Sequence, residues 1–147
     1  MFWYIEMRGI ADIGRMIRSH RDLHAWQRAM ELSEATYGIA RRLPAYETYG
    51  LGQQLRRSAV SIPSNIAEGH GRLHRGDYIH HLSVACGSLA ELQTQLELAR
   101  RIHAVSVKPA HVLADEVGRM LNRLISRLRT PSAIRGLSTQ PHPTPNP

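Results

Sequence analysis

The sequence predicts an all-α protein, folded as an antiparallel up-down-up-down four-helix bundle. In four successive segments, apolar residues recur at spacings of three and four, as on one face of a helix. The connections between these segments are short, which makes neighbouring helices antiparallel. No segment alternates apolar and polar residues as a half-buried strand does. A length of 147 residues suits one domain.

The first predicted helix extends from about residue 22 to residue 43. Asp22 is a favourable N-cap residue, and Pro44 ends the helix. Its buried face is expected to carry Leu23, Trp26, Met30, Ser33, Tyr37, Ala40 and Leu43.

The second predicted helix covers about residues 50–68 and contains Pro63. Proline inside a helix removes a hydrogen bond and crowds the carbonyl four residues earlier, so a kink at Pro63 is expected. Gly69 and Gly71 are expected to stop the helix. The side chains expected to satisfy the freed backbone groups are Ser61, Ser64 and Asn65.

The third predicted helix covers residues 75–103, and the fourth begins near Pro109 and ends before Pro131. The apolar stripe of the third helix is wide, which suggests that one face meets the bundle and another meets a partner subunit. The alternative is a central helix of a monomer. The expected interface residues are Leu82, Leu89, Leu92 and Leu96.

The two ends of the chain differ from the predicted bundle at 21–130. Residues 1–20 are expected to be an extension that is weakly ordered or forms a short helix. Residues 131–147 carry five prolines and few large apolar residues, which predicts a disordered tail. No run approaches about 18 apolar residues, so no membrane span is expected. The single cysteine, Cys86, and the lack of a signal peptide suggest a cytoplasmic protein.

The charge is strongly positive. Nineteen basic residues, eighteen of them arginine, face twelve acidic residues, which gives a net charge of +7. Such a field attracts polyanions, and nucleic acid is the usual partner. The alternative is a solvated surface that reflects an arginine-rich codon bias.

Residues 55–69, with the sequence LRRSAVSIPSNIAEG, resemble the 23S rRNA intervening-sequence protein family. Weaker similarities at 22–27, 88–96 and 118–122 follow in the expected order, so the resemblance covers about 21–129. It implies a left-handed bundle kinked at Pro63 and a ring-shaped homopentamer. A related branch, the accessory protein of diversity-generating retroelements, is basic and binds both nucleic acid and a reverse transcriptase.

Arginines supply the candidate binding residues. Arg119, Arg123 and Arg127 follow at spacing four on the last helix, where unpaired guanidinium groups suit phosphate oxygens. Asp115 is expected to pair with Arg119. The alternative is a solvated face or a subunit contact. The other candidates are Arg56 and Arg57, for which a structural role is favoured, and Arg72 and Arg75, which with His70 and His74 form either a basic lip or an exposed loop.

No catalytic, cofactor or metal site is predicted. Ser61 and Ser64 have no recognisable histidine and carboxylate around them. His70 and His74 are separated by a glycine-containing turn, and His80 and His81 point about 100° apart on a helix. No zinc-ligand motif is present. The scarcity of aromatic residues argues against base stacking as the main mode of binding.

The sequence therefore predicts a non-enzymatic homo-oligomeric bundle that binds RNA or DNA as an accessory or scaffolding protein. The alternative is a protein-interaction module that binds a partner such as a retroelement reverse transcriptase, without direct nucleic-acid contact.

Overall fold

The fold was analysed in a computed structural model that describes residues 17–130. Its four long helices are α2 (His24–Ala40), α3 (Leu51–His70), α4 (Arg75–His103) and α5 (Lys108–Arg129). Two short 3-10 helices, η2 (His20–Asp22) and η3 (Ala45–Glu47), precede α2 and α3. The all-α prediction is confirmed, and residues 17–130 contain no strand. The predicted C-terminal tail and most of the predicted N-terminal extension lie outside the described residues.

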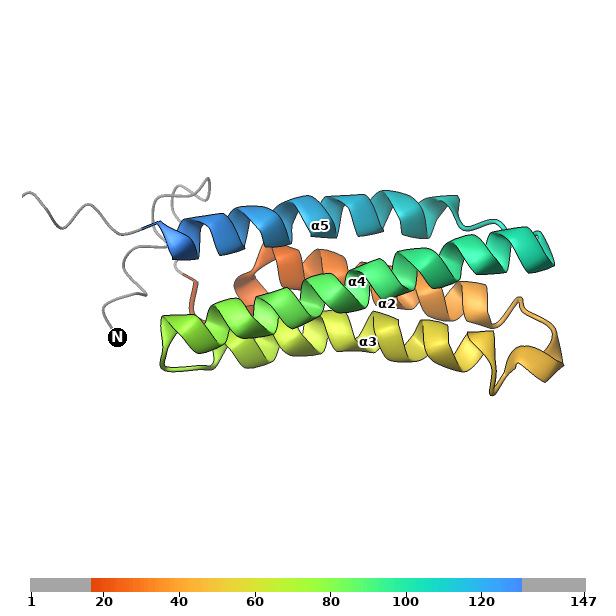
Figure 1. Ribbon diagram of the computed structural model, residues 1–147, viewed down its shortest axis with the longest axis horizontal. Coiled ribbons are helices and arrows are strands. Elements are labelled where there is room, and N and C mark those ends of the chain that lie inside the picture. Colours follow the sequence, from red (N-terminus) through yellow and green to blue (C-terminus); the bar gives the residue numbers. More distant parts are fainter. Residues whose placement is uncertain (1–16, 131–147) are drawn as a thin grey trace, which may run out of the picture.

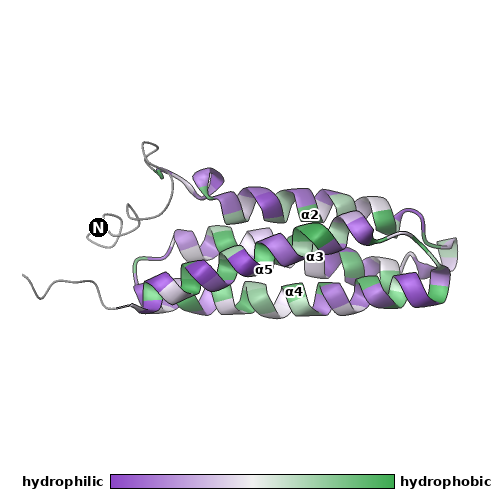
Figure 2. Cartoon of the chain, turned by 90° about the horizontal axis from the view of Figure 1, so that it is seen from above, coloured by the Kyte–Doolittle hydropathy of each residue, from purple (hydrophilic) through white to green (hydrophobic). Residues whose placement is uncertain are grey.

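The helices lie side by side, and the chain reverses direction at each connection (Figure 1). Around the bundle, α3 contacts α2 and α4, and α5 also contacts α2 and α4. Hydrophilic and hydrophobic residues alternate around α5 (Figure 2), as expected for a helix with one buried face. No helix within 17–130 has both the length and the apolar character required to cross a membrane.

The face predicted for the first helix is buried only in part: Leu23, Ser33, Ala40 and Leu43 are buried, and the larger side chains between them are not. Met30 and Tyr37 remain 38% and 39% exposed, and Trp26 is only partly buried. The small side chains of α2 occupy the core instead, because they allow its backbone to approach α3 and α5 closely. The buried residues of α2 are Ala25, Ala29, Leu32, Ser33, Thr36, Ile39 and Ala40.

Asp22 was predicted to be the N-cap of the first helix, and this prediction is wrong. Asp22 belongs to η2, where its carboxylate accepts hydrogen bonds from the backbone N–H groups of Arg18 at 2.9 Å and Ser19 at 3.1 Å. Ser19 is the N-cap residue, and its hydroxyl accepts from Arg21 N at 3.1 Å. A capping box therefore begins one short helix earlier than expected.

The helix α3 continues without interruption through Pro63. Pro63 deprives the carbonyl of Ala59 of its helical donor. The hydroxyl of Ser33, on α2, lies 2.9 Å from that carbonyl and 2.9 Å from the carbonyl of Ala29, and its single proton is shared between the two acceptors. The side chains predicted to satisfy this carbonyl do not do so, because Ser64 and Asn65 donate to the carbonyls of Val60 and Ser61 instead. The expected kink stays a prediction.

Gly69 lies inside α3 and does not stop the helix, which ends at His70. A Cβ at this position would lie 2.7 Å from Cδ2 of Tyr78 and 2.9 Å from Cβ of His81, both on α4. Gly69 is therefore the residue that allows the end of α3 to approach the start of α4.

The four leucines predicted as an oligomer interface face the core of the single chain. Leu82, Leu89, Leu92 and Leu96 are at most 5% exposed. The apolar stripe of α4 is wide because this helix packs against two neighbours, α3 and α5, and buries apolar side chains on both sides. The predicted interface through these leucines is therefore wrong, since they cannot meet a partner without opening the bundle.

Candidate nucleic-acid interface

The outer side of α5 carries the arginine row. The helix buries Val117, Leu121, Ile125 and Leu128, and this keeps Arg119, Arg123 and Arg127 exposed to solvent. At 3.6 residues per turn, each arginine is rotated about 40° from the previous one. Within residues 17–130, none of the three forms an ion pair.

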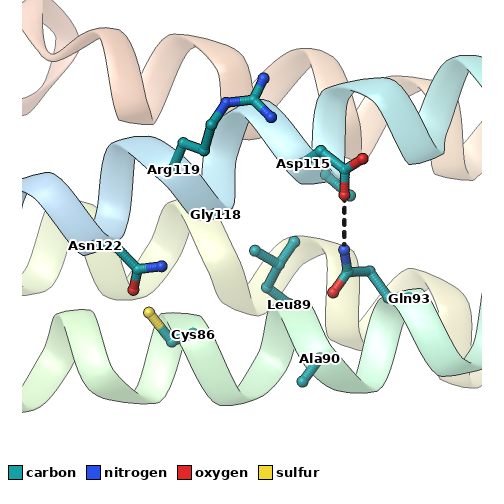
Figure 3. A pocket seen from close by; sticks show the side chains of 9 residues that line it. Cys86, Leu89, Ala90, Gln93, Asp115, Gly118, Arg119 and Asn122 are labelled. Carbon is teal, nitrogen blue, oxygen red and sulfur yellow. Dashed lines mark hydrogen bonds between the residues drawn. The ribbon is translucent and has the colours of Figure 1, made fainter.

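The predicted pairing of Arg119 with Asp115 is wrong. The Asp115 carboxylate accepts a hydrogen bond from Nε2 of Gln93 on α4 at 3.3 Å, and the Arg119 side chain lies apart from it (Figure 3). As a result, all three cations of the row keep their charge uncompensated by a side-chain ion pair within the described chain.

An open cleft of about 370 Å³ lies between α4 and α5, which are otherwise in contact, and Arg119 of the row lines it (Figure 3). It is lined in part by Cys86, Gln93, Asp115 and Asn122. Burial raises the pKa of the Cys86 thiol, which disfavours the reactive thiolate. Among the described residues, no histidine lines this cleft beside the thiol. Across residues 17–130, no group of three histidine, cysteine or acidic side chains could hold a metal ion.

Arg56 and Arg57 have different environments. Arg56 is half-buried, and its Nη2 donates to the carbonyl of Thr48 at 2.7 Å, so it holds the connection that precedes α3. Arg57 is exposed and forms no ion pair with a described residue. Only Arg57 of this pair is therefore available to an external phosphate.

The turn between α3 and α4 does not form the basic lip that was one of the two predicted arrangements. Arg72 forms an ion pair with Glu68, and His70 is buried. Burial lowers the pKa of His70, so it tends to be neutral. Arg75, the first residue of α4, is exposed and unpaired among the described residues. The start of α4 lies at the end of the bundle where α5 terminates (Figure 1).

Arg129 is an exposed arginine at the end of the row that was not among the predicted candidates. Arg129 ends α5 and has no ion pair with any residue in 17–130. Arg127 and Arg129 in the last turn also suit the negative end of the helix dipole. The signal in the sequence was the continuation of arginines after Arg127.

Comparison with known proteins gives a family and a fold. No curated protein matches the chain. Among solved structures, the chain is similar to a protein with unknown function from the S23 ribosomal protein family from Bacteroides thetaiotaomicron VPI-5482. The TM-score is 0.62 at 22% identity, and the match covers 69% of this chain and 95% of that one. At this identity the likeness shows the fold alone. Residues 21–125 match the family model of the 23S rRNA-intervening sequence protein, and the chain belongs to that family.

Proposed function

We propose that this protein is a non-enzymatic accessory or scaffolding protein that binds RNA or DNA through the phosphate backbone. The observation that carries the proposal is the row of Arg119, Arg123 and Arg127, exposed and without ion pairs in the described chain. Arginine holds phosphate oxygens bidentately and is less strongly hydrated than lysine. Arg129 shares the same exposure and extends the row on α5, and Arg75 is exposed at the start of the neighbouring α4. Arg57 is also exposed but lies on α3, across the bundle from α5.

The spacing supports contact with phosphates and not with base edges. Four helical residues rise about 6 Å, so the row spans about 12 Å along α5. A duplex carries about one charge per 1.7 Å of its axis, so several phosphates can face a row of this length. Phosphate contacts position a protein on nucleic acid without reading its sequence. The proposed binding is accordingly non-specific.

Self-association belongs to the same proposal, with a different set of contacts. Val84, Leu98 and Ile102 are exposed apolar residues of α4. At about 100° per residue, Val84 and Ile102 point in one direction and Leu98 lies about 40° away. This outer face of α4 replaces the four core leucines as the candidate surface for a second copy. Binding of a reverse transcriptase remains the alternative use of the same apolar face.

The test compares two variants that each remove two positive charges. R123Q/R127Q changes unpaired arginines, whereas R28Q/R72Q changes arginines that pair with Glu31, Glu116 and Glu68. Fluorescence anisotropy with a labelled RNA duplex is measured between 50 and 200 mM salt. We expect R123Q/R127Q to lose about tenfold in affinity and the salt slope to fall by about 2, at about 0.9 per lost contact.

The control variant should stay within about twofold of the natural protein, because its arginines are already engaged. Equal losses in both variants would mean that net charge, not the α5 row, drives binding. Absence of salt-dependent binding by the natural protein would overturn the proposal as a whole.

A further inference from the structure

Two tyrosines project from the connection between α2 and α3. Tyr46 and Tyr49 are 77% and 86% exposed. Single exposed apolar residues are common and need no explanation. Here two large aromatic rings, three residues apart, contribute little to the core. Their Cα atoms are at most about 11 Å apart, because three residues cannot span more.

The connection that carries these rings is held in place. The Glu47 carboxylate accepts a hydrogen bond from Leu51 N at 2.8 Å and lies 3.0 Å from Nε2 of the buried His103 ring. Arg56 holds the carbonyl of Thr48. Across Tyr49, the N–H of Gly50 donates to the carbonyl of Glu47 at 3.1 Å. A ligand would therefore meet the rings without first ordering the loop.

The surrounding charge is positive. In Figure 1, α2 and α4 end where α3 and α5 begin, and this end of the bundle carries the connection. Of the acids near this end, Glu47 is engaged as described and Glu97 pairs with Arg100 and Arg101, whereas Glu34 on α2 is exposed. Lys108 is exposed and unpaired within 17–130. The exposed cations of this end that form no ion pair with a described residue are Arg41, Arg42 and Lys108.

We infer that the α2–α3 connection is a stacking platform for the bases of single-stranded nucleic acid. The inference rests on the proposed function and names a ligand class for it. Every base has a flat face that stacks on an aromatic ring, and nearby cations hold the backbone. Bases inside a duplex are already stacked on one another and do not offer these faces. The chain as a whole is poor in aromatics, but this connection carries two exposed ones, three residues apart, at an end of the bundle that also carries exposed cations.

The test uses the full chain and two labelled RNAs of the same length, one unstructured single strand and one duplex. Y46S/Y49S removes both rings, and Y46F/Y49F keeps them. We expect the serine variant to lose at least about tenfold in affinity for the single strand, since stacking on each ring accounts for about 5-fold or more. Duplex affinity should change less than twofold, and the phenylalanine variant should retain single-strand binding.

Two controls keep the result interpretable. L73S changes a residue that is 83% exposed in the connection at the other end of the bundle, and it should leave both affinities unchanged. Tyr46 packs near His103, with ring centroids 6.1 Å apart, so its loss could disturb folding. Tyr49→Ser alone avoids this contact and should still lose about fivefold for the single strand.

The outcomes separate this inference from the function on which it rests. Unchanged single-strand affinity in the serine variants would overturn the stacking platform and leave backbone binding intact, with the tyrosines free to serve as a protein contact. Equal losses for the single strand and the duplex would also overturn it. If the natural protein binds neither RNA, both proposals fail together.

Discussion

At the scale of single residues, the most consequential interaction joins Ser33 to the carbonyl that Pro63 leaves without a donor. A buried carbonyl with no hydrogen bond is costly. Ser33 lies on a different helix, so its hydroxyl both compensates for the proline and links α2 to α3. The proline is thus tolerated through tertiary structure and not through its own helix.

This link predicts coupling between the two positions. Ser33→Ala should lower the free energy of unfolding by about 1–3 kcal/mol, because the Ala59 carbonyl becomes unsatisfied. Pro63→Ala restores a helical N–H, so Ser33→Ala should cost at least about 1 kcal/mol less in that background. Urea denaturation of the four proteins measures the coupling. Ser64→Ala, at an exposed site, is the control. Additive effects of the two substitutions would contradict the assignment.

Two helical glycines should respond oppositely to alanine. At Gly69 an added Cβ would collide with Tyr78 and His81, so Gly69→Ala should destabilise by about 1–3 kcal/mol. Gly87, on α4, has no atom within 4 Å of such a Cβ. Gly87→Ala should therefore stabilise by about 0.5–1 kcal/mol, since alanine favours the helix. Thermal and urea unfolding of the two variants measure both changes in stability. The same sign at both positions would show that close approach is not the role of Gly69.

At the scale of elements, Glu47 joins the start of α3 to the end of α4. Its pKa is lowered, first by the hydrogen bond from Leu51 N and then by that from His103. The pKa of Glu97, on α4, is lowered to about 2 by hydrogen bonds from Arg100 and Arg101. Both carboxylates bind a proton more weakly in the folded protein than in the unfolded chain.

This sign fixes the direction of acid sensitivity. The stability contributed by Glu47 is complete above the ordinary pKa of about 4.5 and is lost as the pH falls through the lower folded value. For Glu97 the loss extends down to about pH 2. Urea unfolding between pH 2.5 and 7 should therefore show falling stability below about pH 4.5. Glu47→Gln should remove part of that fall. An identical profile for the variant would contradict a role for this carboxylate.

At the scale of the whole molecule, the two faces of α4 should respond differently to arginine. Leu92 is fully buried, so Leu92→Arg should unfold the bundle and abolish the helical circular dichroism signal. L98R/I102R changes exposed residues and should leave helicity intact. If copies associate through the outer face of α4, this second variant should have a smaller mass by light scattering.

Unchanged mass in L98R/I102R, with an oligomeric natural protein, would place the subunit contact elsewhere. A folded Leu92→Arg variant would contradict the core position of that leucine. The two results are independent, because one reads folding and the other reads association.

Much of the fold followed from the sequence, and the candidate site followed only in part. Periodicity and proline positions predicted four helices, and α4 has the bounds that were predicted, 75–103. The α5 arginines were also predicted as exposed candidates. The buried face of the first helix was predicted only in part, because its alanines and its larger residues both recur at helical spacing. When two neighbouring stripes of a helix both have apolar residues at spacings of three and four, the spacing does not indicate which stripe will face the core.

The features that the sequence predicted correctly are therefore local: the helical class of each segment, the approximate helix ends and the excess of positive charge. These follow from spacing, proline positions and composition, all of which act within a few residues of the chain. The family rests instead on the similarity of a longer stretch, residues 21–125. Tertiary structure decided that four leucines lie in the core, that Asp115 bonds to Gln93 and not to Arg119, and that Tyr46 and Tyr49 stand exposed together. Such outcomes depend on which helices meet, and residues distant in the chain acquire their partners only when the bundle closes.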